Sequence, residues 1–262
     1  MVVVSSKLVY SKVRESPKIA KFFGMLEDDY EVQSLLRVAN TMAVTRLFYN
    51  DHGVIHSRIV SGSALEILDI LIERGIVPTI VRDGEGDVED SKIVIIGGAY
   101  LHDIGNAIHR EGHHLHGVYL ADRILRRLLL KFYADDKHKA IVMKQEILHV
   151  IFSHDENTAP LTIEAGVVKV ADGTDMAEGR ARVPYKLGKS DIHAFSALAI
   201  KRVEIDKGED KPVKIVVDMD NEAGIFQVEQ VLGAKIRSSG IAHLIEVQAL
   251  KRGEQLKTWR AT

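Results

Sequence analysis

The sequence of 262 residues contains no cysteine. This absence excludes disulfide frameworks, thiolate metal sites and cysteine nucleophiles. It also fits a reducing compartment, so we expect a cytoplasmic protein. The chain also has no surplus of positive charge. Its 35 Lys and Arg residues and 37 Asp and Glu residues give a formal net charge of -2. Proteins that bind the nucleic-acid backbone need a basic surface, so nucleic acid is not an expected partner.

Long hydrophobic runs are absent as well. No segment approaches the roughly 20 apolar residues that span a bilayer. The opening segment MVVVSSKLVY has no charged region followed by a long apolar one. We therefore expect neither a membrane partner nor a secretory signal. The composition is that of a globular protein, with 46% apolar and 27% charged residues, in a chain long enough to bury a full core.

Apolar residues recur with helical spacing through most of the first 180 residues. The spacing predicts helices over residues 28–50, 55–75, 114–131, 135–153 and 161–179. The almost wholly apolar segment 92–101 fits a buried helix or a buried strand equally well, and residues 1–12 indicate a strand or an extended arm. Five or six successive helices without intervening strands predict a helical bundle over residues 1–185.

The pattern changes after residues 182–190, where Pro184 and Gly188 interrupt the helical spacing. Three segments rich in Ile and Val indicate strands, over residues 197–205, 212–219 and 242–250. A helical pattern over residues 223–239 lies between the second and the third strand. We therefore predict a small α+β domain of β-β-α-β order over residues 191–252, followed by a loose polar end. Its expected role is regulation or homodimer formation, since exposed sheet edges invite pairing with another chain.

Histidine is abundant, with 12 residues, and most of them lie with aspartates between residues 52 and 172. Imidazole and carboxylate groups bind borderline divalent metals when sulfur is missing. The candidates fall on different expected helices: His56, His102 with Asp103, His116, His154 and Asp172. Side chains from facing helices can converge inside a bundle, so this distribution predicts an interior metal site.

Five short segments carry these residues in a fixed order. They are YNDHGVIHSRIV (49–60), LHDIGN (101–106), REGHHLHG (110–117), IFSHDE (151–156) and VVKVADGTDMAEGRARVP (167–184). Together they resemble the HD superfamily of metal-dependent phosphohydrolases, over about residues 45–182. The resemblance implies a mostly α fold, in which an HD-type helical bundle precedes the small α+β domain.

The resemblance also implies a ligand set for one or two divalent ions, which could be Mn²⁺, Mg²⁺, Co²⁺, Ni²⁺ or Fe²⁺. The first ion would be held by four residues: His56, His102, Asp103 and Asp172. Asp103 would bridge to a second ion, and His116 and His154 would complete the site for that ion. His113 and His149 are alternatives for those two ligand positions.

The expected reaction is hydrolysis of a phosphomonoester or phosphodiester by metal-activated hydroxide at Asp103, which needs no serine or cysteine nucleophile. His52 lies four residues before His56, one helical turn away, and is the expected general acid. Asp175 lies three residues after Asp172 and is expected to orient a ligand histidine. Three cations are candidates for holding the substrate phosphate: Lys169, Arg180 and Arg182.

Two features depart from the resembled pattern of HD-GYP phosphodiesterases. There is no GYP triplet, so the sequence does not support specificity for cyclic-di-GMP, and Asn106 stands where that subgroup often has Lys. The resemblance to the HD superfamily implies a small phosphorylated substrate, and we expect a nucleotide. Two alternatives stay open: an HD-fold di-iron oxygenase, and a non-catalytic, metal-stabilised sensor.

Overall fold

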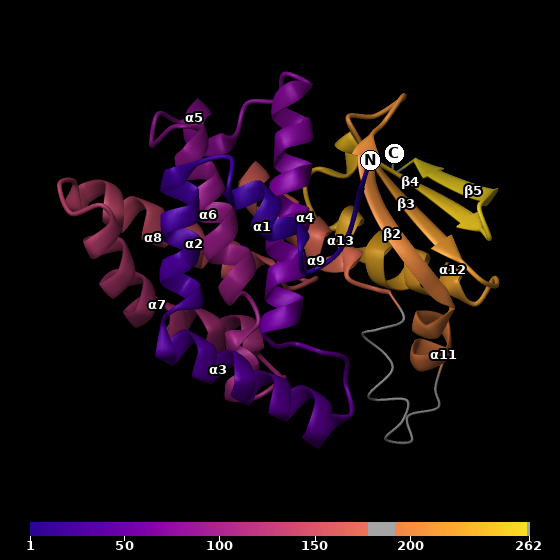
Figure 1. Ribbon diagram of the computed structural model, residues 1–262, viewed down its shortest axis with the longest axis horizontal. Helices are drawn as coiled ribbons and strands as arrows, with labels where there is room; N and C mark the ends of the chain where they lie inside the picture. The colour runs from indigo at the N-terminus through magenta and orange to yellow at the C-terminus, as the bar shows by residue number, and fades with distance from the viewer. Residues whose placement is uncertain (178–191, 261–262) are drawn as a thin grey trace.

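The computed structural model describes residues 1–177 and 192–260 of the chain. A mostly helical part comes first and a five-stranded sheet with its helices follows (Figure 1). In the first part the helices and turns are α1 (Leu8–Val13), α2 (Pro17–Glu27), α3 (Tyr30–Asn40), the π-helical turn η1 (Thr41–Arg46), α4 (Val54–Glu73), α5 (Thr79–Arg82), α6 (Val88–Leu101), the 3₁₀ turn η2 (Ile104–Ala107), α7 (His113–Phe132), α8 (Lys137–Ser153) and α9 (Ile163–Thr174). The predicted mostly α fold is confirmed.

Helix α6 forms the centre of the helical part. Its residues from Ile93 to Leu101 are all buried, because α2, α4, α8 and α9 surround it. Its segment lacks periodicity for this reason: a helix that is covered on every side is apolar on every side. The helix begins at a capping box, in which Asp87 and Asp90 each accept a hydrogen bond from the other's backbone N–H.

The second part contains α11 (Ile192–Ala199), α12 (Gly224–Phe226), the π-helical turn η3 (Gln227–Leu232), α13 (Gly233–Arg237) and the 3₁₀ turn η4 (Ala242–Leu244). Its sheet has the order β1 (Val2–Val3), β2 (Ile200–Lys207), β3 (Val213–Met219), β4 (Ile245–Lys251) and β5 (Glu254–Arg260). The β3–β4 pair is parallel and the other pairs are antiparallel. The segment from α12 to α13 is the crossover that a parallel pair requires.

Several expectations for individual elements were wrong. Residues 251–260 are not a loose end, because Glu254–Arg260 pair with β4. This strand is polar and half-exposed at the sheet edge, so it carries no apolar pattern. Residues 197–199 belong to α11 rather than to a strand, and helix α2 was not predicted from the sequence pattern. Of residues 1–12, only Val2–Val3 form a strand, and α1 follows.

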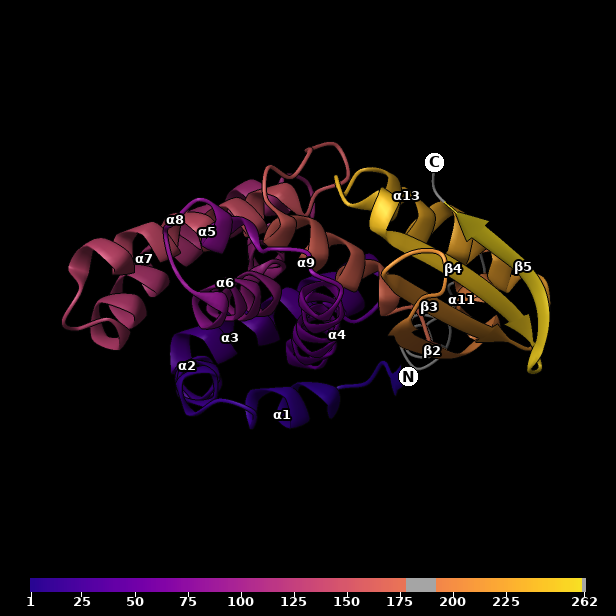
Figure 2. The same ribbon diagram turned by 90° about the horizontal axis from the view of Figure 1, so that it is seen from above.

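The two parts meet along α4 and α9. Helix α4 contacts β2 and β3, and α9 contacts α13 and η3 (Figure 2). The first strand, β1, lies beside β2 at one edge of the sheet, and the last strand, β5, forms the opposite edge. The expected division into residues 1–185 and 191–252 stays a prediction. In the described part of the chain, no helix combines the length and the apolar character that a membrane crossing needs.

Candidate metal centre

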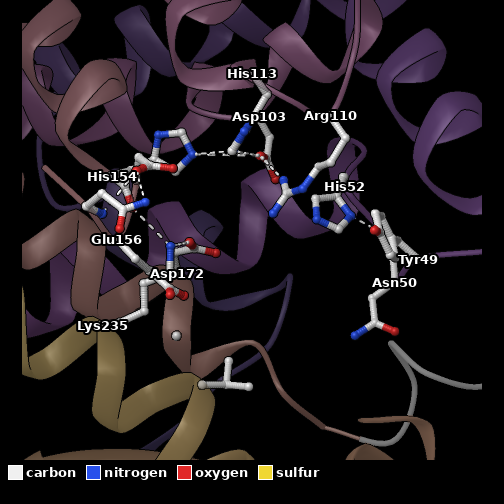
Figure 3. Close-up of a pocket in the computed structure, with 14 residues that line it drawn as sticks. Tyr49, Asn50, His52, Asp103, Arg110, His113, His154, Glu156, Asp172 and Lys235 are labelled. Carbon is white, nitrogen blue, oxygen red and sulfur yellow. Dashed lines mark hydrogen bonds and ion pairs between the residues drawn. The ribbon is translucent and has the colours of Figure 1, made fainter. Parts of the chain in front are cut away.

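A polar pocket of about 470 Å³ opens at the inner ends of several helices. Figure 3 shows its lining residues, which come from the loop before α4, the α6–α7 connection, the end of α8, α9 and α13. The pocket therefore collects side chains from both parts of the chain. Its lining includes three histidines and three aspartates: His52, His113, His154, Asp103, Asp155 and Asp172.

Donor atoms of His56, His102 and Asp103 all lie within 4.8 Å of one another, and Asp172 contacts the two histidines beside them. We call the residues His56, His102, Asp103 and Asp172 the first donor group. His56 Nε2 lies 3.2 Å from His102 Nε2, 3.4 Å from Asp103 Oδ2 and 3.3 Å from Asp172 Oδ1. His102 Nε2 lies 3.3 Å from Asp103 Oδ2 and 3.8 Å from Asp172 Oδ1. Each of these residues comes from a different place in the helical part, as the sequence predicted, except that His102 and Asp103 are neighbours.

Asp103 also takes part in a second donor group, made with His113 and His154. Its other oxygen, Oδ1, lies 3.6 Å from His113 Nε2 and 3.9 Å from His154 Nε2. The two histidine Nε2 atoms are 2.9 Å apart. One carboxylate therefore turns one oxygen toward each group.

The Nδ1 atoms of three of these histidines face acceptors, and this fixes the direction of the Nε2 lone pairs. His102 Nδ1 lies 2.8 Å from the Ala99 carbonyl oxygen and His154 Nδ1 lies 2.6 Å from the Ile151 carbonyl oxygen. His56 Nδ1 lies 2.7 Å from Asp175 Oδ2. Because a carbonyl or carboxylate oxygen can only accept, each Nδ1 carries the proton and each Nε2 turns a lone pair toward the donor groups.

The donor set fits a divalent metal ion. Ligand atoms about 2.1 Å from such an ion lie roughly 3.0–3.4 Å apart, for octahedral and tetrahedral angles respectively. The closest contacts of the first donor group are 3.2–3.4 Å. Imidazole nitrogens and carboxylate oxygens that face one another without an intervening hydrogen are stabilised by a shared cation, so the geometry and the chemistry agree.

Charge within the pocket follows from burial and from the neighbouring groups. Burial alone would raise the pKa of the Asp103 carboxyl, but the nearby His102 and His52 outweigh burial and hold that pKa well below its usual range. Burial lowers the pKa of His113 to about 4, and burial together with His102 lowers the pKa of His154 well below its usual range. Neutral imidazoles beside ionised carboxylates are the protonation states that metal binding requires.

The second donor group differs from the expected ligand set at one position. His116 was expected there, but His113 occupies that place, and the two residues are three apart on α7. The alternative His149 also lies outside both groups, because its Nε2 accepts a hydrogen bond from the Leu161 backbone N–H at 3.0 Å. Gly105 lets the start of α7 approach Asp103, since any side chain at that position would collide with the His113 backbone.

Lys169 does not line the pocket. It is fully buried, and its Nζ donates to the carbonyl oxygens of Thr158 at 2.7 Å and Ser238 at 3.2 Å. The expectation that Lys169 holds substrate was wrong, because its ammonium group is hydrogen-bonded to those two carbonyl oxygens outside the pocket lining. The expected substrate-binding residues Arg180 and Arg182 lie outside the described residues.

Two further residues expected from the sequence lie near the donor groups, and their expected roles stay predictions. Asp175 accepts the hydrogen bond from His56 Nδ1 at 2.7 Å, so it is placed to orient that histidine. His52 lies in the pocket wall, with its Nδ1 2.6 Å from the Asn50 carbonyl oxygen.

Three residues that contact the donor groups were not predicted as site residues from the sequence. Asn106 donates to Asp103 Oδ1 at 2.8 Å, and Arg110 lies 3.7 Å from the same oxygen. Lys235, on α13, lies 2.7 Å from Asp172 Oδ2. Asn106 and Arg110 follow Asp103 by three and seven residues, a helical spacing that was a usable signal for both. No local pattern marks Lys235.

Comparisons with known proteins agree with this arrangement. A family model described as HD domain matches residues 54–177, a range that includes every member of both donor groups. The chain is 51% identical over 219 residues to an uncharacterized protein of Methanocaldococcus jannaschii, and the match covers 84% of each chain. No solved structure matches the chain.

Proposed function

The chain belongs to the HD superfamily, and on that premise we propose that it is a phosphohydrolase that cleaves a phosphate ester of a nucleotide. An HD domain indicates a metal-dependent hydrolase type of function, and the buried donor groups fit a divalent metal site. The observation that carries the finer proposal is the position of Asp103, which turns one carboxylate oxygen toward each donor group. Such a bridge supports two ions at one phosphate.

Each donor group would hold one ion, from among Mn²⁺, Mg²⁺, Co²⁺, Ni²⁺ and Fe²⁺. A divalent ion supplies Lewis acidity, which activates water and neutralises phosphoryl oxygens. The protein keeps the ligands oriented: Asp175 holds the His56 ring, and Asn106 holds the Asp103 carboxylate through hydrogen bonds at 2.7 and 2.8 Å. Fixed ligands lower the reorganisation that the reaction requires.

A proton must reach the leaving oxygen, and His52 is the proposed donor. Its Nδ1 faces the Asn50 carbonyl oxygen, so the ring is held at the pocket wall with Nε2 as the nitrogen for proton transfer. Tyr49 and Asn50 lie beside it, on the opposite side of the view from Lys235 (Figure 3). Tyr49 is a partly exposed aromatic residue of the pocket lining. Nucleobases stack on aromatic side chains, and this residue type supports a nucleotide substrate.

The proposal is tested by measuring phosphate or nucleoside release from a panel of nucleotides, with Mn²⁺, Mg²⁺, Co²⁺ or Ni²⁺ added. We compare the wild type with Asp103→Asn, which keeps the shape of the side chain but removes its charge. His138→Gln, at an exposed histidine of α8, is the matched control. We expect metal-dependent turnover in the wild type and the control, and a loss of about 10²-fold or more in Asp103→Asn.

Other results would contradict the proposal in distinguishable ways. Turnover that survives Asp103→Asn would place the reaction elsewhere in the protein. Iron-dependent oxygen consumption without phosphate release would favour the di-iron oxygenase. Metal binding without either reaction would favour a sensor.

A further inference from the structure

One cation of the pocket comes from the sheet part of the chain. Lys235 lies on α13, and its Nζ contacts Asp172 Oδ2 at 2.7 Å and the His154 backbone carbonyl oxygen at 3.0 Å. Its side chain is only 12% exposed, and that exposed fraction faces the pocket. Figure 3 shows Lys235 below His154 and Asp172, on the opposite side from Arg110.

The packing of α13 on α9 holds Lys235 in this position. Gly166 and Gly173 lie seven residues apart on α9, on the face toward α13. A Cβ atom at Gly166 would lie 2.5 Å from the Ser239 carbonyl oxygen, and one at Gly173 would lie 3.3 Å from the Lys235 Cβ atom. The hydrogen bond from Lys169 to Ser238 fixes the end of α13 from the same side. The close approach at Gly166 excludes a Cβ atom, and the tight fit at Gly173 favours glycine. These two residues of α9 therefore allow α13 to bring Lys235 to the pocket.

Among the described residues, the ammonium group of Lys235 makes two of the three contacts that its donors allow. A lysine ammonium has three N–H donors, and the contacts to Asp172 and to the His154 carbonyl oxygen use two of them. Asp172 contacts Lys235 through Oδ2 and the first donor group through Oδ1, which lies 3.3 Å from His56 Nε2. The third N–H is therefore placed to meet an anion bound beside that group.

Other cations and donors of the pocket are less suited to this task. Arg110 has a side chain that is 38% exposed, and its contacts to Asn106 and Asp103 are longer, at 3.4 and 3.7 Å. Asn106 uses its amide donor on Asp103. A charged donor that is desolvated and held in place binds a phosphate oxygen more strongly than an exposed one.

We propose that Lys235 binds the phosphate group of the substrate, so that the sheet part of the chain completes the catalytic site. This inference rests on the proposed function. The ligand class is a phosphate oxyanion, and Lys235 is a catalytic residue in the sense that it touches the reacting group.

Calorimetric titration with inorganic phosphate tests the proposal on protein loaded with Mn²⁺ and dialysed free of excess metal. The variants are Lys235→Met, Lys235→Gln, which keeps a donor for Asp172 without the charge, and Lys235→Arg. Lys257→Met is the matched control, because Lys257 is an exposed lysine in strand β5 of the sheet part and pairs with Glu229. We expect phosphate affinity to fall about tenfold or more in the Met and Gln variants, to recover in part in the Arg variant, and to stay unchanged in the control.

The outcomes separate this inference from the proposed function. If Lys235 only ties α13 to α9, the Met variant will unfold at a lower temperature but the folded Gln variant will bind phosphate as tightly as the wild type, and the inference is overturned. A wild type that binds no phosphate also overturns it. If phosphate binding depends on Lys235 but no nucleotide is hydrolysed, the inference stands and the proposed reaction fails.

Discussion

Asp175 Oδ2 lies 2.7 Å from His56 Nδ1, and this contact determines which nitrogen of His56 faces the first donor group. The carboxylate accepts the Nδ1 proton, so the Nε2 lone pair points at His102 and Asp103. A carboxylate in this position also raises the basicity of the imidazole ring. Asp175 therefore influences metal binding without being a ligand.

Replacement of Asp175 by Asn is expected to weaken Mn²⁺ binding by about 10–100-fold. The amide group can donate to Nδ1, which favours the opposite tautomer and turns a proton toward the metal position. Calorimetric titration with Mn²⁺ measures the change. Asp155→Asn serves as the control, because Asp155 lines the pocket but belongs to neither donor group. Equal affinities in the wild type and Asp175→Asn would show that the contact does not orient His56.

The choice between His113 and His116 is open to a direct test. His113 Nε2 lies 2.9 Å from His154 Nε2, whereas His116 is in neither donor group. We expect His113→Gln to reduce the number of tightly bound ions per chain by one, and His116→Gln to leave that number unchanged. Elemental analysis of metal-loaded, dialysed protein gives the stoichiometry. Loss of an ion in His116→Gln instead would support the ligand set expected from the sequence.

Gly166→Ala is expected to separate α13 from α9. The added methyl group would lie 2.5 Å from the Ser239 carbonyl oxygen, which is too close for a non-bonded contact. We expect the free energy of unfolding to fall by about 1–3 kcal/mol, as for other overpacked sites, and urea titration measures it. Gly24→Ala in α2 is the control, since nothing lies within 4 Å of its Cβ position; there the change should be neutral or stabilising by up to about 1 kcal/mol. A destabilisation of the control as large as that of Gly166→Ala would contradict the packing argument.

Asp90 makes the stability of the helical part depend on pH. Burial alone would raise the pKa of its carboxyl, but Lys139, Lys18 and the Asp87 backbone N–H outweigh burial and hold the pKa well below the usual 3.8. A lowered carboxyl pKa stabilises the folded state fully above pH 3.8, and this stabilisation is lost as the pH falls below that value.

Asp90→Asn should therefore lower the free energy of unfolding by about 2 kcal/mol near neutral pH. The difference between the wild type and the variant should shrink as the pH falls toward about 3, and urea titrations at several pH values measure it. Asp136→Asn is the control, because Asp136 caps the neighbouring helix α8 but is exposed. A difference that stays constant with pH would mean that the lysines do not stabilise the charged form of Asp90.

Much of the site could be predicted because its residues carry their chemistry in their type and order. His56, His102, Asp103, His154 and Asp172 were expected to gather inside the helical part, and the structure brings them together. The choice of His113 over His116 could not be predicted. The two residues are separated by almost one helical turn, and only the packing of α7 against the α6–α7 connection determines which of them faces Asp103.

Lys235 was missed for a different reason. It lies on an amphipathic helix of the sheet part, where a lysine usually indicates a solvated face. Its contact with Asp172 joins two parts of the chain that share no sequence pattern. The strand Glu254–Arg260 was missed because an edge strand has no need for an apolar face. In both cases the deciding interaction is between distant residues, and no local spacing reflects it.

The pairing of Val2 with Ile205 constrains how the protein can assemble during synthesis. The first strand leaves the ribosome long before its partner strand exists, so it must stay unpaired while the helices form beside it. Contacts between such distant segments are slow to form, because a long loop has to close first. We therefore expect the sheet to close at β1 as a late step, and until then the edge of β2 is open to pairing with other nascent chains.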